Sequence, residues 1–432
     1  MVSVLAWLFL VFAILLFSGI PVSVGLGLTS LFYCVITGNY SFILMIPKRM
    51  FAGMNSFVIM AIPLFMLTGS LMNKGGVTTR LIKLSDLLVG RLRGGLAHVN
   101  VLASMLFAGI TGSALSDIAA MGSVLVPAMV EDGYDKEFST AVTAASAIQG
   151  PIIPPSIPAV LVAAVTGIST GALFLGGAIP GMLLGVGCFI IIFFLARKRK
   201  YPKNETKYTK EQIFKIIKDS IVAIMAPVII LGGILSGIFT PTEAAGIAVL
   251  YSFVVAVLIY KNVGLKSLIN IMKETIIQSS KIYFIIGVAT SFAWFLSLER
   301  FPDLLTNILL SYSGGSTWKI LLILNVILLL WGMFISTNPG ILILGPILFP
   351  IIQSFGINPV HFGVIMIVNF MIGLITPPFG VGLFSAVAIG EVSLIDLIKE
   401  LWPFLIIELA VLCLVTFVPA ISLFLPRLFG LI

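Results

Sequence analysis

Two segments of the chain place prolines, glycines and hydroxyl side chains in an order that suits the binding of a hard cation. They are Gly150-Pro-Ile-Ile-Pro-Pro-Ser-Ile-Pro158 and Gly373-Leu-Ile-Thr-Pro-Pro-Phe-Gly380, and each interrupts a long apolar run. So many prolines cannot continue a helix, because proline lacks a backbone N–H and restricts the residue before it. Unwound backbone at membrane depth is tolerated where it lines a buried cavity, and its free carbonyls are ligands of the kind that Na⁺ takes. A single Pro-Pro pair often only kinks a membrane helix, but two pairs in equivalent positions favour a function.

A polar patch between two apolar stretches precedes each broken segment. The first patch is Thr111-Gly-Ser-Ala-Leu-Ser-Asp117 and the second is Ser336-Thr-Asn-Pro-Gly340. The basic loops on either side require both arms of each patch to return to the same side of the membrane, so we expect two re-entrant hairpins with polar tips. Each tip is expected to lie beside a break and to form a Na⁺ site with it. The expected sodium ligands are Gly112, Ser113, Gly150 and Pro154 for the first site, and Ser336, Thr337, Asn338, Gly373 and Thr376 for the second.

An anionic solute between the tips would find little fixed positive charge. No Lys or Arg occurs from Gly94 to Val130, and only Lys319 lies near the second tip. Asn338-Pro339 predicts a helix cap followed by a first-turn proline, which would aim a helix N-terminus at the cavity. Asp117 could cap the descending half of the first hairpin or belong to an ion site, and the two roles are compatible. The expected solute-binding residues are Ser116, Ser156, Asn338 and Thr376.

The composition requires an integral membrane protein. Of 432 residues, 59% are hydrophobic and 10% charged, and the mean hydropathy is +1.18. So few charges cannot cover a soluble body of this size, and the net charge of +8 does not indicate nucleic-acid binding, because Lys and Arg lie in short loops between apolar spans. We interpret the first residues as a retained span rather than a signal peptide. Isolated cysteines at 34, 188 and 413 indicate neither a zinc site nor disulfides.

The basic clusters set the orientation. The clusters Lys74–Arg93, Arg197–Lys218 and Lys261–Lys281 lie in the cytoplasm by the positive-inside rule. The number of spans between these clusters then places the N-terminus on the outer side of the membrane. Lys48 and Arg49 fall on the same outer side and are an exception to the positive-inside rule.

The chain repeats itself. Adding 223 to the positions of eight glycines and prolines in the first half gives the same residue type in the second half. The basic segment 74–93 maps onto 297–316, where the only basic residue is Arg300, so equivalent loops are expected on opposite faces. Inverted repeats of this kind are typical of secondary transporters. The matching residues are Gly109, Gly122, Pro127, Gly133, Gly150, Pro154, Pro155 and Gly167 with Gly332, Gly345, Pro350, Gly356, Gly373, Pro377, Pro378 and Gly390.

We therefore expect an all-α integral membrane fold of two inverted repeats, each with five spans and one hairpin. The first repeat, 1–218, is expected to hold scaffold spans in 1–73, a surface arm at 78–93, a hairpin at 95–131, a broken span at 138–166 and a span at 171–196. The second repeat, 219–432, is expected to hold scaffold spans in 220–297, an arm at 302–313, a hairpin at 318–355, a broken span at 361–390 and a span at 397–425.

Several signatures of other classes are absent from the sequence. There is no GxxxxGK[ST] motif for ATP, no HExxH or paired-carboxylate set for hydrolysis, and no channel filter or voltage-sensor helix. Transport without ATP would have to be driven by an ion gradient. Thr240-Pro-Thr-Glu243 predicts a helix start closed by a capping box rather than a chemical site. His98 and His361 have no nearby ligand partners in the sequence and are interpreted as structural.

Four motifs together resemble the large membrane subunit of tripartite ATP-independent periplasmic (TRAP) transporters. They are Gly109-Ile-Thr-Gly-Ser-Ala-Leu-Ser-Asp117, the Pro-Pro-Ser that ends at Ser156, Gly237-Ile-Phe-Thr-Pro-Thr-Glu-Ala-Ala245, and Thr376-Pro-Pro-Phe-Gly380. The resemblance covers nearly the whole chain. It implies a sodium-coupled elevator importer of the bacterial inner membrane, for a carboxylate solute such as sialic acid or a C4-dicarboxylate. It also implies two or more coupling Na⁺ ions, a separate four-span membrane subunit and a periplasmic binding protein.

Two other hypotheses stay open at the level of the sequence. A related stand-alone sodium/anion symporter would share repeats and hairpins but need no binding protein. A membrane-embedded enzyme or channel is disfavoured by the missing catalytic residues.

Overall fold

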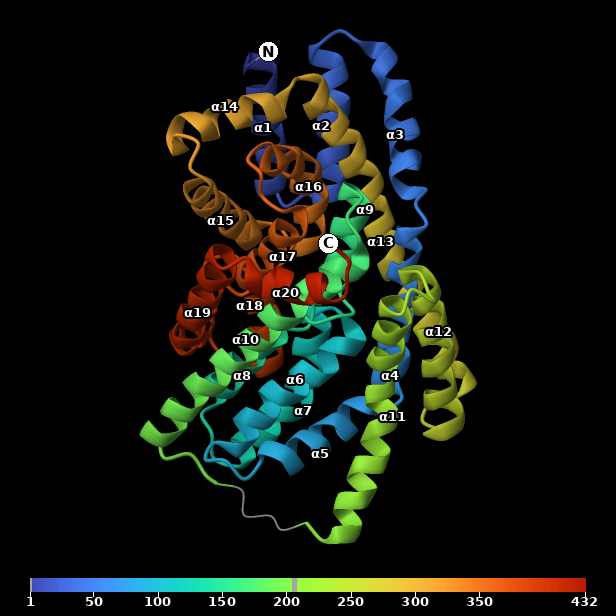
Figure 1. Cartoon of the computed structure of the whole chain (residues 1–432), viewed down its shortest axis with the longest axis vertical. Helices are drawn as coiled ribbons and strands as arrows, with labels where there is room; N and C mark the ends of the chain where they lie inside the picture. Colours follow the sequence, from blue (N-terminus) through green and yellow to red (C-terminus); the bar gives the residue numbers. More distant parts are fainter. Residues whose placement is uncertain (1, 204–207) are drawn as a thin grey trace.

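The computed structural model describes residues 2–203 and 208–432, whose regular elements are all helices (Figure 1). By length and apolar composition, seven helices of this part of the chain can cross a membrane, and one bent pair of helices raises the number to eight. The expected class, an all-α membrane protein, agrees with this architecture.

The first part of the chain differs from the prediction at its third span. After α1 (Val2–Phe17) and α2 (Val22–Ile36), a helical segment of η1 (Tyr40–Leu44) and α3 (Met45–Met54) bends by 66° into η2 (Val58–Met60) and α4 (Ala61–Lys74). We expected a span only over 56–72, because Lys48 and Arg49 break the apolar run of α3. The structure accommodates Arg49 by placing its guanidinium 5.0 Å from the centre of the Trp294 ring.

The segments expected as arm, hairpin, broken span and following span of the first half hold one, two, two and one helices, in that order. These helices are α5 (Val77–Val89), α6 (Gly95–Thr111), α7 (Ala114–Glu131), α8 (Lys136–Ala147), α9 (Ile157–Thr166) and α10 (Thr170–Lys198).

The second half follows a similar order, except that one long helix stands where the first half has the bent pair, and a further short helix follows the last span. It holds α11 (Lys210–Leu235), α12 (Pro241–Phe253) with η3 (Val254–Ile259), α13 (Leu265–Leu298), α14 (Phe301–Ser313), α15 (Thr317–Phe334), α16 (Thr337–Ser354), α17 (Pro359–Leu374), α18 (Val381–Gly390), α19 (Leu394–Phe417) and α20 (Ala420–Leu428).

Local sequence explains several helix ends. Thr240 and Glu243 form the expected capping box at the start of α12. The last span, expected over 397–425, instead ends at Phe417, and α20 is a separate helix. Pro419 is the cause, because the residue before a proline avoids the helical region, and Val418 has φ −120° and ψ 82°.

The helix bounds follow the offset that the glycines and prolines show. Adding 223 to both ends of α7 gives the bounds of α16, and the same addition moves 42–75, which covers α3 and α4, onto α13. Both breaks also contain a cis peptide bond, at Pro154-Pro155 and at Pro377-Pro378.

The helices form two groups that meet along the long axis. On the right of Figure 1, α13 packs against α2, α3 and α4, and α12 packs against α4 and α11. On the left, α7 and α19 pack against α8, and α15 packs against α17. The groups touch where α13 meets α16, where α4 meets α6 and α9, and where α11 meets α5 and α6, so α4 and α13 lie against the two hairpins.

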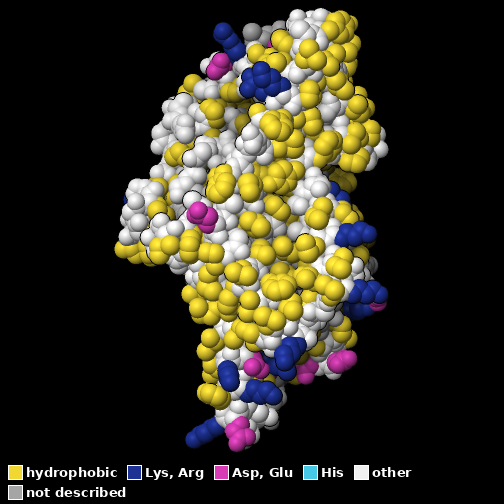
Figure 2. All heavy atoms as spheres, turned by 90° about the vertical axis from the view of Figure 1, so that its right-hand side faces the viewer, with side chains coloured by type: hydrophobic (Ala, Val, Ile, Leu, Met, Phe, Trp, Pro, Cys, Tyr) yellow, Lys and Arg dark blue, Asp and Glu magenta, His cyan; other side chains and the backbone are white. Residues whose placement is uncertain are grey.

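The surface fits a membrane environment. Figure 2 shows one broad face covered mainly by hydrophobic side chains, with most Lys, Arg, Asp and Glu side chains toward its lower half and a smaller group at its upper end. Large apolar side chains such as Leu44, Phe214 and Leu250 are exposed in the structure. In water such a surface would be unfavourable, whereas in lipid it is the expected exterior.

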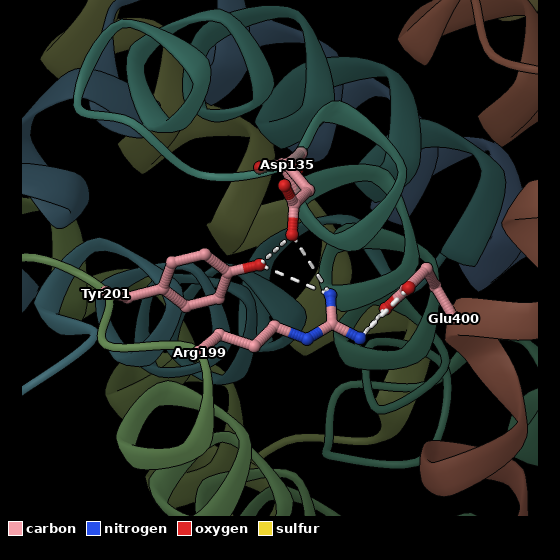
Figure 3. A network of polar contacts seen from close by, with 5 residues as sticks. Asp135, Arg199, Tyr201 and Glu400 are labelled. Carbon is pink, nitrogen blue, oxygen red and sulfur yellow. Dashed lines mark hydrogen bonds and ion pairs between the residues drawn. The ribbon is translucent and has the colours of Figure 1, made fainter.

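A polar network ties together the ends of α8, α10 and α19 (Figure 3). Arg199 donates to both carboxylate oxygens of Glu400, at 2.7 and 3.0 Å, and to Asp135 at 3.1 Å. The Tyr201 hydroxyl donates to the same Asp135 carboxylate at 2.5 Å. Burial, and then this hydrogen bond, raise the pKa of Tyr201 to about 12. The network therefore fixes one end of the left-hand group of helices.

Candidate functional site

A cavity of about 600 Å³ lies where the two hairpins face α4 and α13. Its lining includes the first tip, from Thr111 to Ser116, and the second tip, from Ser336 to Asn338. The structure thus brings together two polar segments that are far apart in the sequence. Of the expected site residues, Gly112, Ser113, Ser116, Ser336, Thr337 and Asn338 border this cavity.

The first tip is shaped by a left-handed glycine and a serine cap. Gly112 has φ +59°, and a Cβ there would lie 3.2 Å from the Pro155 carbonyl oxygen. The tip therefore lies directly against the first break, as the ion-site hypothesis requires. Ser113 then begins α7 as its N-cap, and its Oγ accepts a hydrogen bond from the Ser116 hydroxyl at 3.2 Å.

Asp117 joins the tip to the first break. The carboxylate is fully buried; Oδ1 accepts a hydrogen bond from the Thr111 hydroxyl at 2.5 Å, and Oδ2 has no protein partner. A Cβ on Gly150 would lie 2.1 Å from that free Oδ2, so only glycine leaves room for the carboxylate. The N-cap of α7 is Ser113, so Asp117 is not the cap residue. An unpaired oxygen at this depth is an available cation ligand.

The first break itself is closed by Ser156. Its hydroxyl accepts a hydrogen bond from the Ala159 amide at 3.1 Å, as N-cap of α9, and donates to the Pro151 carbonyl. Ser156 is buried and does not border the cavity, so the structure does not bring it to the expected solute position. The Pro154 carbonyl faces Gly109 of α6, where a Cβ would lie 3.4 Å away.

The second tip starts its helix earlier than expected. The N-cap of α16 is Ser336, and Asn338 and Pro339 already belong to the first turn. The prediction that Asn338 is the N-cap of this helix was therefore wrong. A proline is tolerated in the first turn, where backbone N–H groups lack helical acceptors, so the helix can begin before it. The N-terminus of α16 still borders the cavity, and the Thr337 hydroxyl there is buried without a partner.

The second break touches the second hairpin but lies behind the cavity. A Cβ on Gly373 would lie 2.8 Å from the Gly332 carbonyl carbon, so α15 and α17 pack closely at these glycines. The Thr376 hydroxyl donates to the Ile372 carbonyl at 2.6 Å. Neither Gly373 nor Thr376 borders the cavity, although Met371 and Leu374 do.

Sequence reasoning missed the opposite wall of the cavity. Ser70 and Asn73 of α4 and Glu274, Gln278 and Lys281 of α13 border it. The signal was available, because polar and charged side chains at helical spacing within a long apolar helix mark a wet face. We had assigned these residues only to scaffold spans and to a basic cluster.

Other polar groups lie elsewhere. The rings of His98 and His361 bond to Gly94 and to Ser422 and Thr416, away from the cavity. Among residues 2–203 and 208–432, no three His, Cys, Asp or Glu side chains gather as a metal site. Carbonyl, hydroxyl and single-carboxylate ligands are thus the available donors for a cation.

A family model and several named relatives that match this chain describe transporters. The family described as "Tripartite ATP-independent periplasmic transporter, DctM component" matches residues 9–421. A sialic acid TRAP transporter large permease protein of Vibrio cholerae is 38% identical, over 99% of this chain and 98% of the other. A C4-dicarboxylate TRAP transporter large permease protein of Rhodobacter capsulatus is 37% identical, over 96% of this chain and 97% of the other.

A solved structure supports the fold alone. The YdaH transporter of Alcanivorax borkumensis matches with a TM-score of 0.60 at 15% identity, over 88% of each chain. With its apolar helices, paired hairpins and shared cavity, the chain is a multi-pass membrane transporter subunit. It belongs to the DctM family of TRAP transporters, the large permease component.

Proposed function

We propose that the chain carries out sodium-coupled import of a carboxylate-bearing solute across the bacterial inner membrane. One observation carries the proposal: two hairpin tips, each packed against a proline-broken helix, meet at one cavity. Tips and breaks supply backbone carbonyls, hydroxyls and one carboxylate oxygen without a partner, Oδ2 of Asp117, and such oxygen atoms suit Na⁺. Relatives in the family are named as transporters of sialic acid or of C4-dicarboxylates, and both solutes bear carboxylate groups.

Two sodium sites are proposed, related by the offset of 223. The first uses Gly112 and Ser113 of the tip, Gly150 and Pro154 of the break, and the carboxylate of Asp117. The second uses Ser336, Thr337, Asn338, Gly373 and Thr376. Thr337 supports the second site because its buried Oγ1 has no partner in the structure. At the first site, the free Oδ2 of Asp117 has the same role.

The solute carboxylate is proposed to lie between the N-termini of α7 and α16, near Ser116 and Asn338. Helix N-termini carry partial positive charge and free N–H groups, which favour an anion. The tips hold no Lys or Arg, so bound Na⁺ offsets the anionic charge and couples solute binding to sodium. Each uncompensated positive charge that crosses a 100 mV potential contributes about 2.3 kcal/mol to import. Thr376 would reach the solute only if the second break moved.

The two groups of helices suggest how transport proceeds. We propose that the halves are inverted repeats, that the spans in 1–73 and 220–297 form a fixed scaffold, and that both hairpins and both breaks move as an elevator. In the structure these spans are α1 to α4 and α11 to α13. The matched bounds of α7 and α16 support the repeat. The packing of α13 on α2, α3 and α4, and the separate packing of α7 and α19 on α8, support two bodies. A small four-span subunit is proposed to bind the scaffold, and a periplasmic binding protein to deliver the solute.

Uptake by proteoliposomes containing the complete complex tests the proposal. The chain and its small subunit are reconstituted, and uptake of succinate or N-acetylneuraminate is measured with the binding protein and an inward Na⁺ gradient. We expect uptake with Na⁺ and none with K⁺ in its place. Uptake that proceeds equally in K⁺ would refute sodium coupling. Sodium-driven uptake without any binding protein would favour the stand-alone symporter.

A further inference from the structure

The scaffold wall of the cavity contains one cation that the proposed function leaves without a role. Lys281, Gln278 and Glu274 of α13 all border the cavity. Their spacing places them on one face of the helix, as i, i+4 and i+7 positions are. Lys281 is the only Lys or Arg among the lining residues, and Glu274 is the only acid.

Lys281 and Glu274 do not neutralise each other. They lie two turns apart, about 10 Å along the axis at 1.5 Å per residue. Among the described residues, the ion pairs are those of Lys136, Arg199 and Lys399 with acids elsewhere, and neither Lys281 nor Glu274 takes part. A lysine without a counter-charge in a membrane helix is costly, and such residues commonly mark solute or ion pathways.

The direction of the helices places Lys281 deeper than Glu274. Along the segment of η1 and α3, Phe42 contacts the Phe295 ring, with centroids 6.3 Å apart, whereas Gly53 packs on Thr290 and Met54 packs on Gly287. Partner numbers fall as the segment's numbers rise, so α3 and α13 run antiparallel. Along α4, the cavity-lining residues are followed by Lys74 as the residue numbers rise. Along α13, they are followed by Lys273 as the residue numbers fall. Both directions lead into basic clusters, so Glu274 lies nearer the basic end of the wall. Lys281, the last residue of its cluster, lies nearer the hairpins.

The α4 wall touches the moving tip directly. A Cβ on Gly69 would lie 3.1 Å from the Thr111 Cα and 3.2 Å from the Ile110 carbonyl oxygen. In this structure the first tip therefore stands against the scaffold at the level of Gly69, next to Ser70 in the cavity wall. The cavity is thus bounded by helix N-termini on the hairpin side and by a lysine on the scaffold side.

We propose that Lys281 is the fixed positive charge that meets the solute carboxylate in this cavity, with the Gln278 amide as a neighbouring donor. This rests on the proposed function and adds the scaffold residue that selects anionic solutes. The hairpins supply oriented N–H groups, and the scaffold supplies the charge. By the positive-inside rule the basic clusters are cytoplasmic, so Lys281 meets the solute while the cavity opens toward the side of release.

A cysteine in the cavity wall reports on solute binding. Ser70→Cys is a small change at a residue that borders the cavity, and it is made in a Cys413→Ser background because Cys413 is the exposed native cysteine. The purified permease with its small subunit, in Na⁺, is labelled with a maleimide, and succinate or N-acetylneuraminate is titrated as protectant. Lys281→Gln, Lys281→Arg and the control Lys273→Gln are compared, since Lys273 lies on the same helix outside the cavity.

The expected result separates charge from structure. Lys281→Gln should raise the half-protecting concentration about tenfold, which corresponds to about 1.4 kcal/mol. Lys281→Arg should stay within about twofold, and Lys273→Gln should not change it. Labelling without solute should be equal in all variants, which shows an intact fold. In uptake assays the same change should appear in KM more than in Vmax.

Each other outcome is decisive. Equal protection in Lys281→Gln and in its parent would overturn the role of Lys281 while leaving the proposed function intact. Loss of protection in Lys281→Arg as severe as in Lys281→Gln would show a steric rather than an electrostatic role. Absence of protection by either solute in the parent would overturn this inference, and absence of sodium-driven uptake as well would overturn the proposed function with it.

Discussion

Gly150→Ala should weaken sodium binding because the new methyl group displaces the Asp117 carboxylate. The added Cβ would lie 2.1 Å from Oδ2, while Oδ1 is held by the Thr111 hydroxyl at 2.5 Å. The Ala147 carbonyl oxygen would lie 3.2 Å away, so the backbone cannot move far in that direction. The carboxylate must rotate and lose its hydrogen bond, and a hydrogen bond to a charged group contributes about 1.5–3 kcal/mol.

This loss corresponds to a roughly 10- to 150-fold higher sodium concentration for half-maximal uptake, at 1.4 kcal/mol per tenfold. The assay is solute uptake in proteoliposomes at varied Na⁺. The matched control is Gly246→Ala in α12, where a Cβ meets nothing within 4 Å. The double variant Gly150→Ala with Asp117→Ala removes the clash and should restore thermal stability but not sodium affinity.

Two results would refute this reasoning. If Gly150→Ala needs no more sodium than the parent, Asp117 is not displaced or is not a ligand. If the double variant regains full sodium affinity, the carboxylate contributes nothing and the effect of Gly150→Ala is purely steric.

Three further predictions concern other parts of the molecule. Gly69→Ala places a methyl group 3.1 Å from the Thr111 Cα and should slow uptake at least several-fold. The control Gly232→Ala, whose Cβ meets nothing within 4 Å, should leave the uptake rate unchanged. Equal uptake rates for the two variants would show that the first tip does not pass α4. Thr337→Ala removes a buried hydroxyl that has no protein partner, so it should leave the melting temperature nearly unchanged but raise the sodium requirement; the reverse pattern would count against the second site. The pKa of Tyr201 is raised to about 12 from 10.0, so the folded state keeps a proton that the unfolded state loses. Stability should therefore fall as pH rises from 10 to 12, and the Tyr201→Phe variant should lack this part of the slope in thermal unfolding.

The sequence predicted the elements better than their contacts. Proline and glycine act locally, so Pro154, Pro155, Pro377 and Pro378 marked both breaks, and the capping box at Thr240 marked the start of α12. One prediction from local sequence, the cap of the second hairpin helix, was wrong. Asn338 resembled a cap, but Ser336 begins α16, because a proline in the first turn does not prevent an earlier start.

The cavity wall could not be deduced from local patterns. Lys281 belongs to a basic cluster in the sequence, and only the antiparallel packing of α3 and α4 on α13 turns it toward the hairpin tips. Ser156 shows the opposite case. Its hydroxyl was expected to face the solute, but the backbone amide and carbonyl groups of the first break use both of its hydrogen-bonding functions. Which of these side chains faces the cavity depends on contacts between helices that are far apart in the sequence. Local sequence patterns do not reveal those contacts.

The number of sodium ions moved with each solute molecule tests the central claim most directly. Proteoliposomes containing the complete complex are held at a series of membrane potentials, and the potential at which net flux of radioactive solute reverses is measured for known gradients of Na⁺ and solute. Two coupled sites predict at least two Na⁺ ions per solute molecule and an inward movement of net positive charge for a monocarboxylate. A reversal potential that corresponds to one Na⁺ ion per solute, or that does not change with the sodium gradient, would contradict the account.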